Sequence, residues 1–270
     1  MLFSELVKKI EEIAPVGNAA TWDKSGIQVA SEKTAIQTLA VCLDPSPASV
    51  AKALAVGADC ILSHHPLALS PELPSRLDDY HHVLRLLFGG DVALYAAHTS
   101  LDTNPAGPVG WLAGELRLSG VRILEPLSVS GERSRFGYGL VGEMPDALSM
   151  TDFFDLLKPF VDLELATICG NIPRLVKRVA YCTGSGASLY EYARAASADI
   201  YITGDVKYHN ALVATCAILD VGHHSLEEEM MRRMALLLQQ SNLDAKVVFI
   251  PSSSPFRRID SLKCSGGYHE

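Results

Sequence analysis

The chain has 270 residues, 48% hydrophobic and 20% charged, a composition that excludes an intrinsically disordered protein and suits one large domain or two of ordinary size. Its net charge of −8 and its pI of about 5.6 argue against nucleic acid as the partner. No apolar run approaches the ~18 residues of a membrane-spanning helix. Charged residues interrupt the N-terminal stretch, unlike the apolar core of a signal peptide. We therefore expect a cytoplasmic protein without a membrane partner.

The cysteines show no Cys-x-x-Cys pairing, and several fall in apolar, strand-like segments. We expect free, buried thiols in a reducing compartment rather than disulfides or a zinc knot. The six are Cys42, Cys60, Cys169, Cys182, Cys216 and Cys264.

Strand and helix patterns alternate over the first hundred residues. A strand at 38–43 precedes a helix at 46–56, which has Pro47 in its first turn and Gly57 just past its end, and a strand at 59–63 follows. This order predicts a parallel βαβ unit, whose ligands collect at the carboxyl ends of the strands. The other elements expected here are an amphipathic first helix carrying Leu2, Leu6, Ile10 and Ile13, a short strand ending at Val29, a helix at 78–88, a strand at 92–96 and a helix at 109–117.

Two adjacent histidines, His64 and His65, end the strand at 59–63 and are followed by Pro66. Within a strand, neighbouring side chains point to opposite faces. At a strand end that the proline forces the chain to leave, both rings can instead surround one pocket. A polar strand end is the ordinary interpretation of such a pair, so the rest of the chain has to decide between the two.

The second half of the chain returns to the same pattern after a middle stretch, about 120–178, that carries no evident chemistry. Ser225 followed by Glu228 has the spacing of a capping box, which predicts a helix beginning at Leu226. The expected elements are strands at 136–141 and 163–168 with a helix at 151–160, then a strand at 178–182, a tight turn at 184–186, a helix at 188–196, and strands at 198–203 and 217–221.

The two halves repeat each other. Ala58-Asp59 matches Ala198-Asp199 at an offset of 140, as does Ala40-Val-Cys42 with Ala180-Tyr-Cys182. His98-Thr-Ser-Leu-Asp102 matches His223-His-Ser-Leu-Glu227 at an offset of 125. We therefore predict an α/β fold of two similar, duplicated α/β halves with mixed sheets around a central metal cleft. The first half is expected at 1–125 and the second at 126–270, with no large inserted domain.

Imidazoles and carboxylates gather at the predicted strand ends. These side chains are ligands of zinc, manganese, iron, cobalt or nickel, and the lack of thiolates argues against a purely structural zinc site. Even three of these histidines with one aspartate and one glutamate would exceed the needs of one catalytic zinc, and such a set suits two metals about 3.5–4 Å apart. The candidates are His64 and His65, His98 and Asp102, Asp205 and His209, and His223 and Glu227.

Charge decides how such ligands are used. Two dications ~3.5 Å apart repel by roughly 19 kcal/mol at an effective dielectric near 20, so negative groups must lie between them. A bridging carboxylate and a metal-bound hydroxide, the expected nucleophile, meet this need. The run Glu227-Glu228-Glu229 is otherwise typical of a solvated helix start favoured by the helix dipole. We assign that ordinary role to Glu228 and Glu229 and the bridge to Glu227.

Five motifs resemble those of the YbgI-type dinuclear metal-centre proteins, many of which are named GTP cyclohydrolase 1 type 2 homologues. The resemblance implies two divalent metal ions per chain, held by His64, His65, Asp102, His223 and Glu227, and a toroidal homohexamer. His224 stands beside His223, but the spacing to Glu227 favours His223. The motifs are Trp22-Asp23-Lys-Ser-Gly26-Ile-Gln, Ser63-His64-His65-Pro66, His98-Thr-Ser-Leu-Asp102, Thr203-Gly-Asp205-Val-Lys-Tyr-His209 and Gly222-His223-His-Ser-Leu-Glu227.

Several residues keep more than one interpretation. His98, Asp205 and His209 could each orient a ligand, move a proton or be an ordinary satisfied polar side chain. Gly184-Ser-Gly186 could cradle a phosphate, but a strand-to-helix turn needs the same residues. His81 and His82 are expected at the surface.

Two functions follow. The first is a metal-dependent hydrolase of a small molecule; the resemblance points to a nucleotide, through hydrolytic opening of the imidazole ring of GTP. The second is a non-enzymatic metal-binding assembly, serving as a metal store, chaperone or interaction scaffold. Nucleic-acid binding ranks third because the chain is acidic.

Overall fold

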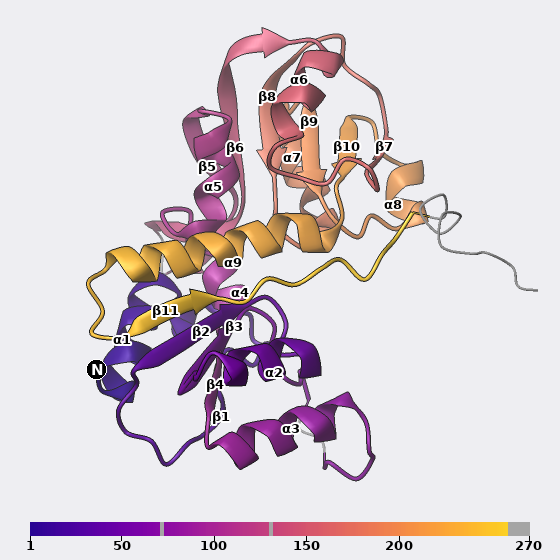
Figure 1. Ribbon diagram of the computed structural model, residues 1–270. Coiled ribbons are helices and arrows are strands. Elements are labelled where there is room, and N and C mark those ends of the chain that lie inside the picture. The colour runs from indigo at the N-terminus through magenta and orange to yellow at the C-terminus, as the bar shows by residue number, and fades with distance from the viewer. Residues whose placement is uncertain (71–72, 130–131, 259–270) are drawn as a thin grey trace, which may run out of the picture.

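The computed structural model describes residues 1–70, 73–129 and 132–258, whose strands form two mixed sheets (Figure 1). One sheet has the strand order β1-β4-β3-β2-β11 and the other β5-β6-β8-β9-β10-β7. The long helix α9 lies between the two sheets, so the molecule consists of two α/β halves with α9 packed between them. The predicted α/β class with two mixed sheets is confirmed.

The elements of the first part of the chain are α1 (Phe3–Ile13), η1 (Val16–Asn18), β1 (Gly26–Val29), β2 (Thr38–Cys42), α2 (Pro47–Ala55), β3 (Cys60–Ser63), α3 (Asp79–Gly90), β4 (Ala93–Ala96), α4 (Thr99–Asp102), η2 (Pro108–Gly110) and α5 (Trp111–Glu115). Those that follow are β5 (Ser119–Val129), β6 (Glu132–Leu148), α6 (Met150–Leu157), β7 (Thr167–Cys169), β8 (Val176–Tyr181), η3 (Ala187–Leu189), α7 (Tyr190–Ala195), β9 (Ile200–Thr203), α8 (Tyr208–Leu212), β10 (Ala217–Asp220), α9 (His223–Gln240) and β11 (Lys246–Phe249).

The predicted repeat is present in the topology. In each sheet three consecutive strands run parallel, β2-β3-β4 in one and β8-β9-β10 in the other, and the last of the three pairs antiparallel with a short strand, β1 or β7. The carboxylate of Asp59 accepts from the backbone N–H groups of residues 37 and 38, and that of Asp199 accepts from residues 177 and 178. The same side chain therefore ties the same two strands in both halves.

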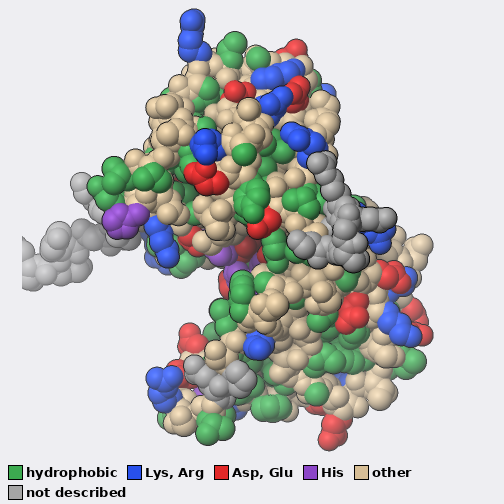
Figure 2. All heavy atoms as spheres, turned by 180° about the vertical axis from the view of Figure 1, so that it is seen from behind, with side chains coloured by type: hydrophobic (Ala, Val, Ile, Leu, Met, Phe, Trp, Pro, Cys, Tyr) green, Lys and Arg blue, Asp and Glu red, His purple; other side chains and the backbone are tan. Residues whose placement is uncertain are grey.

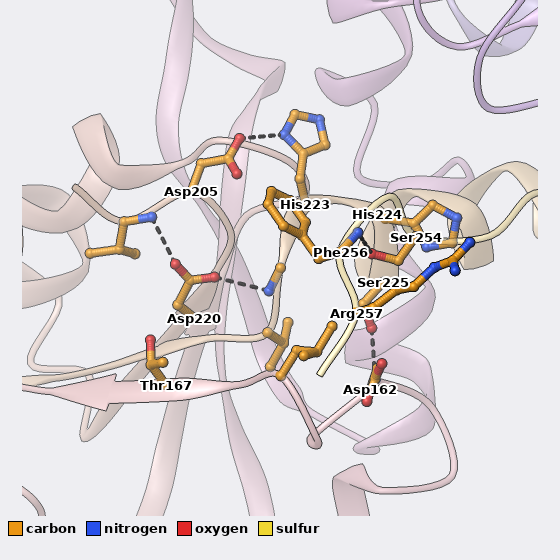
Figure 3. A pocket seen from close by; sticks show the side chains of 14 residues that line it. Asp162, Thr167, Asp205, Asp220, His223, His224, Ser225, Ser254, Phe256 and Arg257 are labelled. Atoms are coloured by element: carbon orange, nitrogen blue, oxygen red, sulfur yellow. Dashed lines mark hydrogen bonds and ion pairs between the residues drawn. The ribbon is translucent and has the colours of Figure 1, made fainter. Parts of the chain in front are cut away.

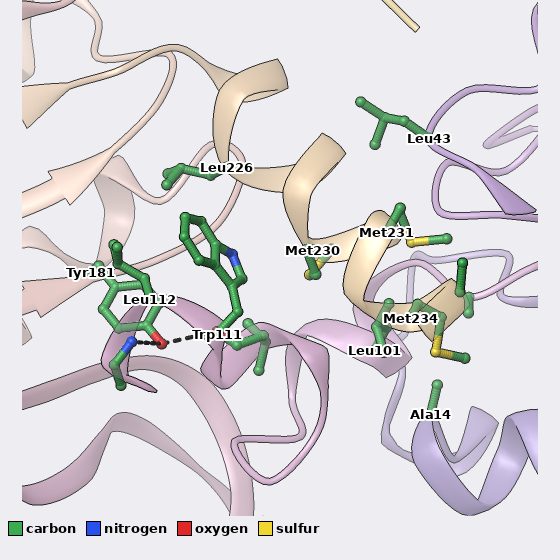
Figure 4. Close-up of a cluster of buried hydrophobic side chains, with 14 of the residues drawn as sticks. Ala14, Leu43, Leu101, Trp111, Leu112, Tyr181, Leu226, Met230, Met231 and Met234 are labelled. Atoms are coloured by element: carbon green, nitrogen blue, oxygen red, sulfur yellow. Dashed lines mark hydrogen bonds between the residues drawn. The ribbon is translucent and has the colours of Figure 1, made fainter. Parts of the chain in front are cut away.

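Strand side chains alternate between two cores because both faces of each parallel strand are covered. In β3, Ile61 packs towards α2 and α3, whereas Leu62 joins a central cluster. In β9, Tyr201 packs towards α7 and Ile202 joins the same central cluster. The central cluster thus contains strand residues of both sheets. Figure 4 shows its side chains gathered around α9, among them Leu226, Met230, Met231 and Met234.

The division of the chain between the two sheets does not fall at the predicted boundary between residues 125 and 126. Strand β5 begins at Ser119 and pairs with β6 of the second sheet. Strand β11 returns to the first sheet, parallel to β2. The predicted strand at 163–168 is also shorter and later, since β7 covers Thr167–Cys169. The places of β7 and β11 depend on pairing with strands far away in the sequence, which local sequence patterns do not contain, whereas β5 pairs with the strand that directly follows it.

The five described cysteines are free; Cys42, Cys60 and Cys182 are buried, and Cys169 and Cys216 are partly exposed. Cys264 lies outside the described residues. Within those residues, no helix has both the length and the apolar character needed to cross a membrane.

Candidate metal centre

The two adjacent histidines turn their rings towards one acidic side chain. Strands β2, β3 and β4 end in register at Cys42, Ser63 and Ala96, so the residues that follow them meet at one sheet edge. The rings of His64 and His65 lie 5.0 Å apart and are tilted by 53°. The Nε2 of His64 is 3.4 Å from Oε1 of Glu227, and the Nε2 of His65 is 3.2 Å from Oε2. Each ring therefore addresses a different oxygen of the same carboxylate.

The helix α9 brings Glu227 and His223 to this point. It begins at His223, after Gly222 with a φ of 77°, and residues four apart share a helix face. The Nε2 of His223 lies 2.8 Å from Oε2 of Glu227. The i, i+4 spacing of the two side chains thus places both on the side that faces the histidine pair.

The predicted capping box is wrong, and α9 begins three residues before Leu226. The hydroxyl of Ser225 accepts from the backbone N–H of Asp162 at 2.8 Å. The carboxylate of Glu228 accepts from the backbone N–H and the hydroxyl of Ser252. Both side chains have tertiary partners that take the place of the local cap.

Glu227 is only 3% exposed, and a glycine makes room for it. A Cβ on Gly184, whose φ is +61°, would lie 2.2 Å from Oε1 of Glu227. The other glycine of this turn, Gly186, donates its backbone N–H to the hydroxyl of Thr203. The turn at 184–186 therefore serves close packing around the cluster.

Asp102 is the second acidic side chain of the cluster. One of its oxygens lies 3.8 Å from Nε2 of His64 and accepts from the hydroxyl of Thr183 at 3.3 Å. Burial raises the pKa of its carboxyl group. It stands in the last turn of α4, which follows β4 at the same sheet edge.

Three partly exposed histidines of the cluster each form a hydrogen bond between Nδ1 and a carboxylate. Asp44 bonds His65 at 2.7 Å, Asp205 bonds His223 at 2.7 Å, and Asp23 bonds His98 at 2.8 Å. The fully buried His64 instead pairs its Nδ1 with the carbonyl of Ala97 at 2.9 Å. Such partners fix the ring orientation and leave Nε2 as the atom that faces the cluster, an arrangement typical of metal-binding histidines.

Burial and the carboxylates act in opposite directions on the imidazoles. Burial lowers the pKa of His65, but hydrogen bonds with Asp44 and Glu227 outweigh it and raise the pKa to about 10. In the same way Glu227 and Asp205 raise the pKa of His223 to about 9. Burial would raise the pKa of Glu227, but the charge of His64 and the hydrogen bond from His223 hold it well below its ordinary value.

The geometry of the cluster fits metal ions. Three groups each offer ligand atoms within 4.8 Å of one another: His64, Asp102 and Glu227; His65, His223 and Glu227; and His64, His65 and His98. The Nε2 of His64 is buried and has no hydrogen-bond partner among the described residues, although it points into the cluster. A buried imidazole nitrogen aimed at two carboxylates is what a divalent cation would satisfy.

Comparison with known proteins agrees with this site. Residues 1–255 match the model of a family described as Duf34/NIF3 (NGG1p interacting factor 3). The chain belongs to this family. It is 31% identical over 234 residues to a Streptomyces coelicolor protein named GTP cyclohydrolase 1 type 2 homolog, covering 83% of this chain and 81% of the relative. NIF3-like protein 1 of Drosophila melanogaster is 27% identical, over 91% of this chain and 84% of its own length.

Solved structures of relatives share the NIF3 fold. The protein ybgI superposes with a TM-score of 0.81 at 27% identity, over 95% of this chain and all of that one. Reduced HcgD from Methanocaldococcus jannaschii superposes with a TM-score of 0.77 at 27% identity, over 93% and 98% of the two chains. The resemblance to YbgI-type proteins expected from the motifs is therefore confirmed.

The structure separates the candidate residues of this NIF3-family chain. It brings together the five predicted ligands, His64, His65, Asp102, His223 and Glu227, with His98 beside them. Asp205 is a histidine partner, whereas His209 is exposed on α8 and joins none of the three groups. His224 also joins none of the three groups, and its Nε2 lies 3.0 Å from the hydroxyl oxygen of Ser252.

Sequence reasoning missed the roles of Asp23 and Asp44. The Asp23 carboxylate accepts from the backbone and hydroxyl of Thr99 as well as bonding His98. Burial would raise its pKa, but these hydrogen bonds hold it below its ordinary value. Two features of the sequence could have indicated these roles: Asp44 directly follows the predicted strand at 38–43, and Asp23 belongs to the motif that begins at Trp22.

The site opens to solvent between the two halves. Figure 2 shows the molecule hollowed there, with histidine and acidic side chains at the bottom of the hollow. On one side of His223 lies a pocket of about 340 Å³, which Figure 3 shows bordered by Asp205, Asp220, Phe256 and Arg257. A second pocket, of about 440 Å³, is bordered by His65, Asp44 and Tyr80. A small molecule can therefore approach the cluster from solvent.

Proposed function

We propose that this NIF3-family chain holds two divalent metal ions and acts as a hydrolase on a small molecule. One observation carries the proposal: two groups of ligand atoms share the carboxylate of Glu227, which is buried and turns one oxygen to His64 and the other to His65. One ion would take His64, Asp102 and Glu227, and the other would take His65, His223 and Glu227. A pair of ions bound in this way supplies electrophilic polarisation of the substrate and an activated water.

The protein's own residues would prepare this chemistry. Glu227 is held in place because it stands on the buried face of the long helix α9 and fills the space above Gly184. Asp44 and Asp205 fix the rings of His65 and His223, so that binding requires little reorganisation. His98, paired with Asp23, lies next to both His64 and His65 and could move a proton at the edge of the site.

The names of the relatives make GTP the first substrate to test, through hydrolytic opening of its imidazole ring. We expect turnover of GTP by the purified protein once its metal content has been measured. Glu227→Gln should lower kcat by about 100-fold or more, because even groups that only support a metal ligand cost 10–100-fold. Glu228→Gln is the matched control, because Glu228 contacts Ser252 and His224 and belongs to none of the three groups of candidate ligands. Equal activity in wild type and Glu227→Gln would refute the assignment.

Metal content tests the site independently of any substrate. Elemental analysis of protein purified without chelators should find two metal ions per chain. His64→Ala should lose at least one of them, whereas His224→Ala should keep both, since His224 contacts Ser252 instead of Glu227. Fewer than one ion per chain in the wild type would contradict the dinuclear site.

A non-enzymatic metal-binding scaffold is the second candidate, favoured by exposed apolar side chains. Tyr208, Leu212 and Val213 all stand exposed on and just after α8. A scaffold would bind metal tightly but turn over no nucleotide, phosphoester or amide.

We also propose the toroidal hexamer that the family resemblance implies; light scattering should then give a mass near six times 29.1 kDa.

A further inference from the structure

The loop that precedes β1 is tied firmly to the start of α4. The Asp23 carboxylate accepts from the backbone and hydroxyl of Thr99, and the hydroxyl of Ser25 accepts from the backbone N–H of His98. The backbone N–H of Ala20 donates to the hydroxyl of Thr99, and Ser25 bonds Asp23 and Ser100. Residues 20–25 are therefore held against the metal cluster by hydrogen bonds on both sides of Trp22.

Trp22 nevertheless remains largely in solvent. Its side chain is 57% exposed, whereas the chain's other tryptophan, Trp111, is 6% exposed in the central core. A tryptophan can bury 150–250 Å² of surface, so leaving one exposed on a fixed loop forgoes a large stabilisation. The hydrogen bonds of the loop thus hold a flat aromatic surface in place without burying it.

The place of that surface is beside the cluster. The ring of Trp22 lies 5.8 Å from that of His98 in an edge-to-face arrangement. His98 in turn lies 5.2 Å from the ring of His64 and 5.5 Å from that of His65. The ring of His98 thus neighbours both Trp22 and the histidine pair, so the exposed aromatic surface stands within one imidazole ring of the predicted ligands His64 and His65.

We propose that Trp22 is a substrate-binding residue and that the substrate presents a planar heteroaromatic ring, such as a purine, which stacks on it. The inference rests on the proposed hydrolase function: when the bond to be cleaved belongs to the ring itself, that ring must lie at the cluster. Stacking on tryptophan is strong and tolerant of the ring's substituents, and a pre-positioned side chain pays little conformational entropy. The class of substrate is thereby narrowed to compounds with an exposed aromatic face.

The test compares two ligands that differ only in the ring. Guanosine 5′-monophosphate and ribose 5-phosphate are titrated into the metal-containing protein by calorimetry. We expect the guanine compound to bind at least tenfold more tightly, and Trp22→Leu to weaken its binding about tenfold or more. Trp22→Phe should retain most of the affinity because it keeps an aromatic face. Phe88→Leu, at an exposed position on α3, is the matched control and should match the wild type.

Metal content, measured for each variant, shows whether the cluster remains intact. The inference would be overturned if the two ligands bind with equal affinity or if neither binds. It would also be overturned if Trp22→Leu binds the guanine compound within twofold of the wild-type affinity. Stronger Trp22-dependent binding of choline than of the guanine compound would also overturn it, by assigning Trp22 to a cation. If the guanine compound binds in a Trp22-dependent way but no substrate is hydrolysed, only the proposed hydrolase function is refuted. If substrate is hydrolysed and Trp22→Leu leaves kcat/KM unchanged, only the role of Trp22 is refuted.

Discussion

Glu227 is a carboxylate that is 3% exposed, and three imidazoles surround it. Isolating such a charge from water costs several kcal/mol unless opposite charge compensates it. In the absence of metal, protons on the imidazoles provide the compensation, which is why the pKa values of His65 and His223 are raised. A metal ion would replace those protons at the same nitrogen atoms.

Gly184 tests how closely the turn must approach Glu227. In Gly184→Ala the new Cβ would lie 2.2 Å from Oε1, so the carboxylate must move. We expect metal content to fall below one ion per chain by elemental analysis. Gly57→Ala is the control: it has a similar positive φ, with a strain of about 1–2 kcal/mol, but open space around the new atom. Equal metal loss in both variants would indicate backbone strain alone.

The raised histidine pKa values predict how the metal-free protein responds to pH. The folded-state pKa values, about 10 for His65 and about 9 for His223, lie above the ordinary 6.5. Their contribution to stability is therefore complete below pH 6.5 and is lost as the pH rises through 9 and 10. The melting temperature of chelator-treated protein should fall from pH 7 to pH 10. Saturating metal should reduce the fall, because metal binding displaces these protons; a flat profile without metal would contradict the shifts.

The repeated βαβ unit is the structural element that builds the site. Its parallel strands end in register, so the residues after β2, β3 and β4 face those after β8, β9 and β10 across α9. The helix α9 differs from its counterpart α4 in length, and only α9 extends through the central core. Equivalent strand ends therefore differ in what they contribute. The predicted ligand pair His64 and His65 follows β3, whereas its counterpart β9 is followed by Asp205, which bonds His223; Asp102 and Glu227 stand at matching places after β4 and β10.

Asp59 and Asp199 should contribute similarly to stability because each accepts two backbone N–H groups from the neighbouring strand. Asp59→Ala and Asp199→Ala should each lower the free energy of unfolding by about 1–3 kcal/mol, the cost of leaving such donors unpaired. Urea denaturation measures this. Asp155→Ala, at an exposed position on α6, should change the value by less than about 0.5 kcal/mol. A loss in only one of the two variants would show that the halves are not equivalent here.

At the scale of the whole molecule, the two sheets share one hydrophobic core. Strand residues of both sheets and the buried face of α9 belong to the same cluster. Protein cores are packed as closely as organic crystals, so a change of side-chain volume next to one sheet shifts the packing against the other sheet. The distance between the two ligand groups therefore depends on the packing of α9.

Met231→Ala should reveal this coupling. The side chain is fully buried in the central cluster, and its truncation should cost about 2–5 kcal/mol. Calorimetry should show one cooperative transition shifted to lower temperature, because both halves lose packing together. Leu237→Ala, on the exposed side of the same helix, should have a much smaller effect. Two separated transitions in the variant would contradict a shared core.

The sequence by itself determined the α/β class, the repeat and the eight candidate side chains at the strand ends, because these follow from patterns along the chain. The resemblance of its motifs to a known family then selected the five predicted ligands that the structure brings together. Only the tertiary structure decided that Asp23 and Asp44 pair with His98 and His65, and that His209 lies apart. It also decided the start of α9 and the return of β11 to the first sheet. These outcomes depend on hydrogen bonds and strand pairings between residues far apart in the chain, which exist only once the two halves have packed around α9.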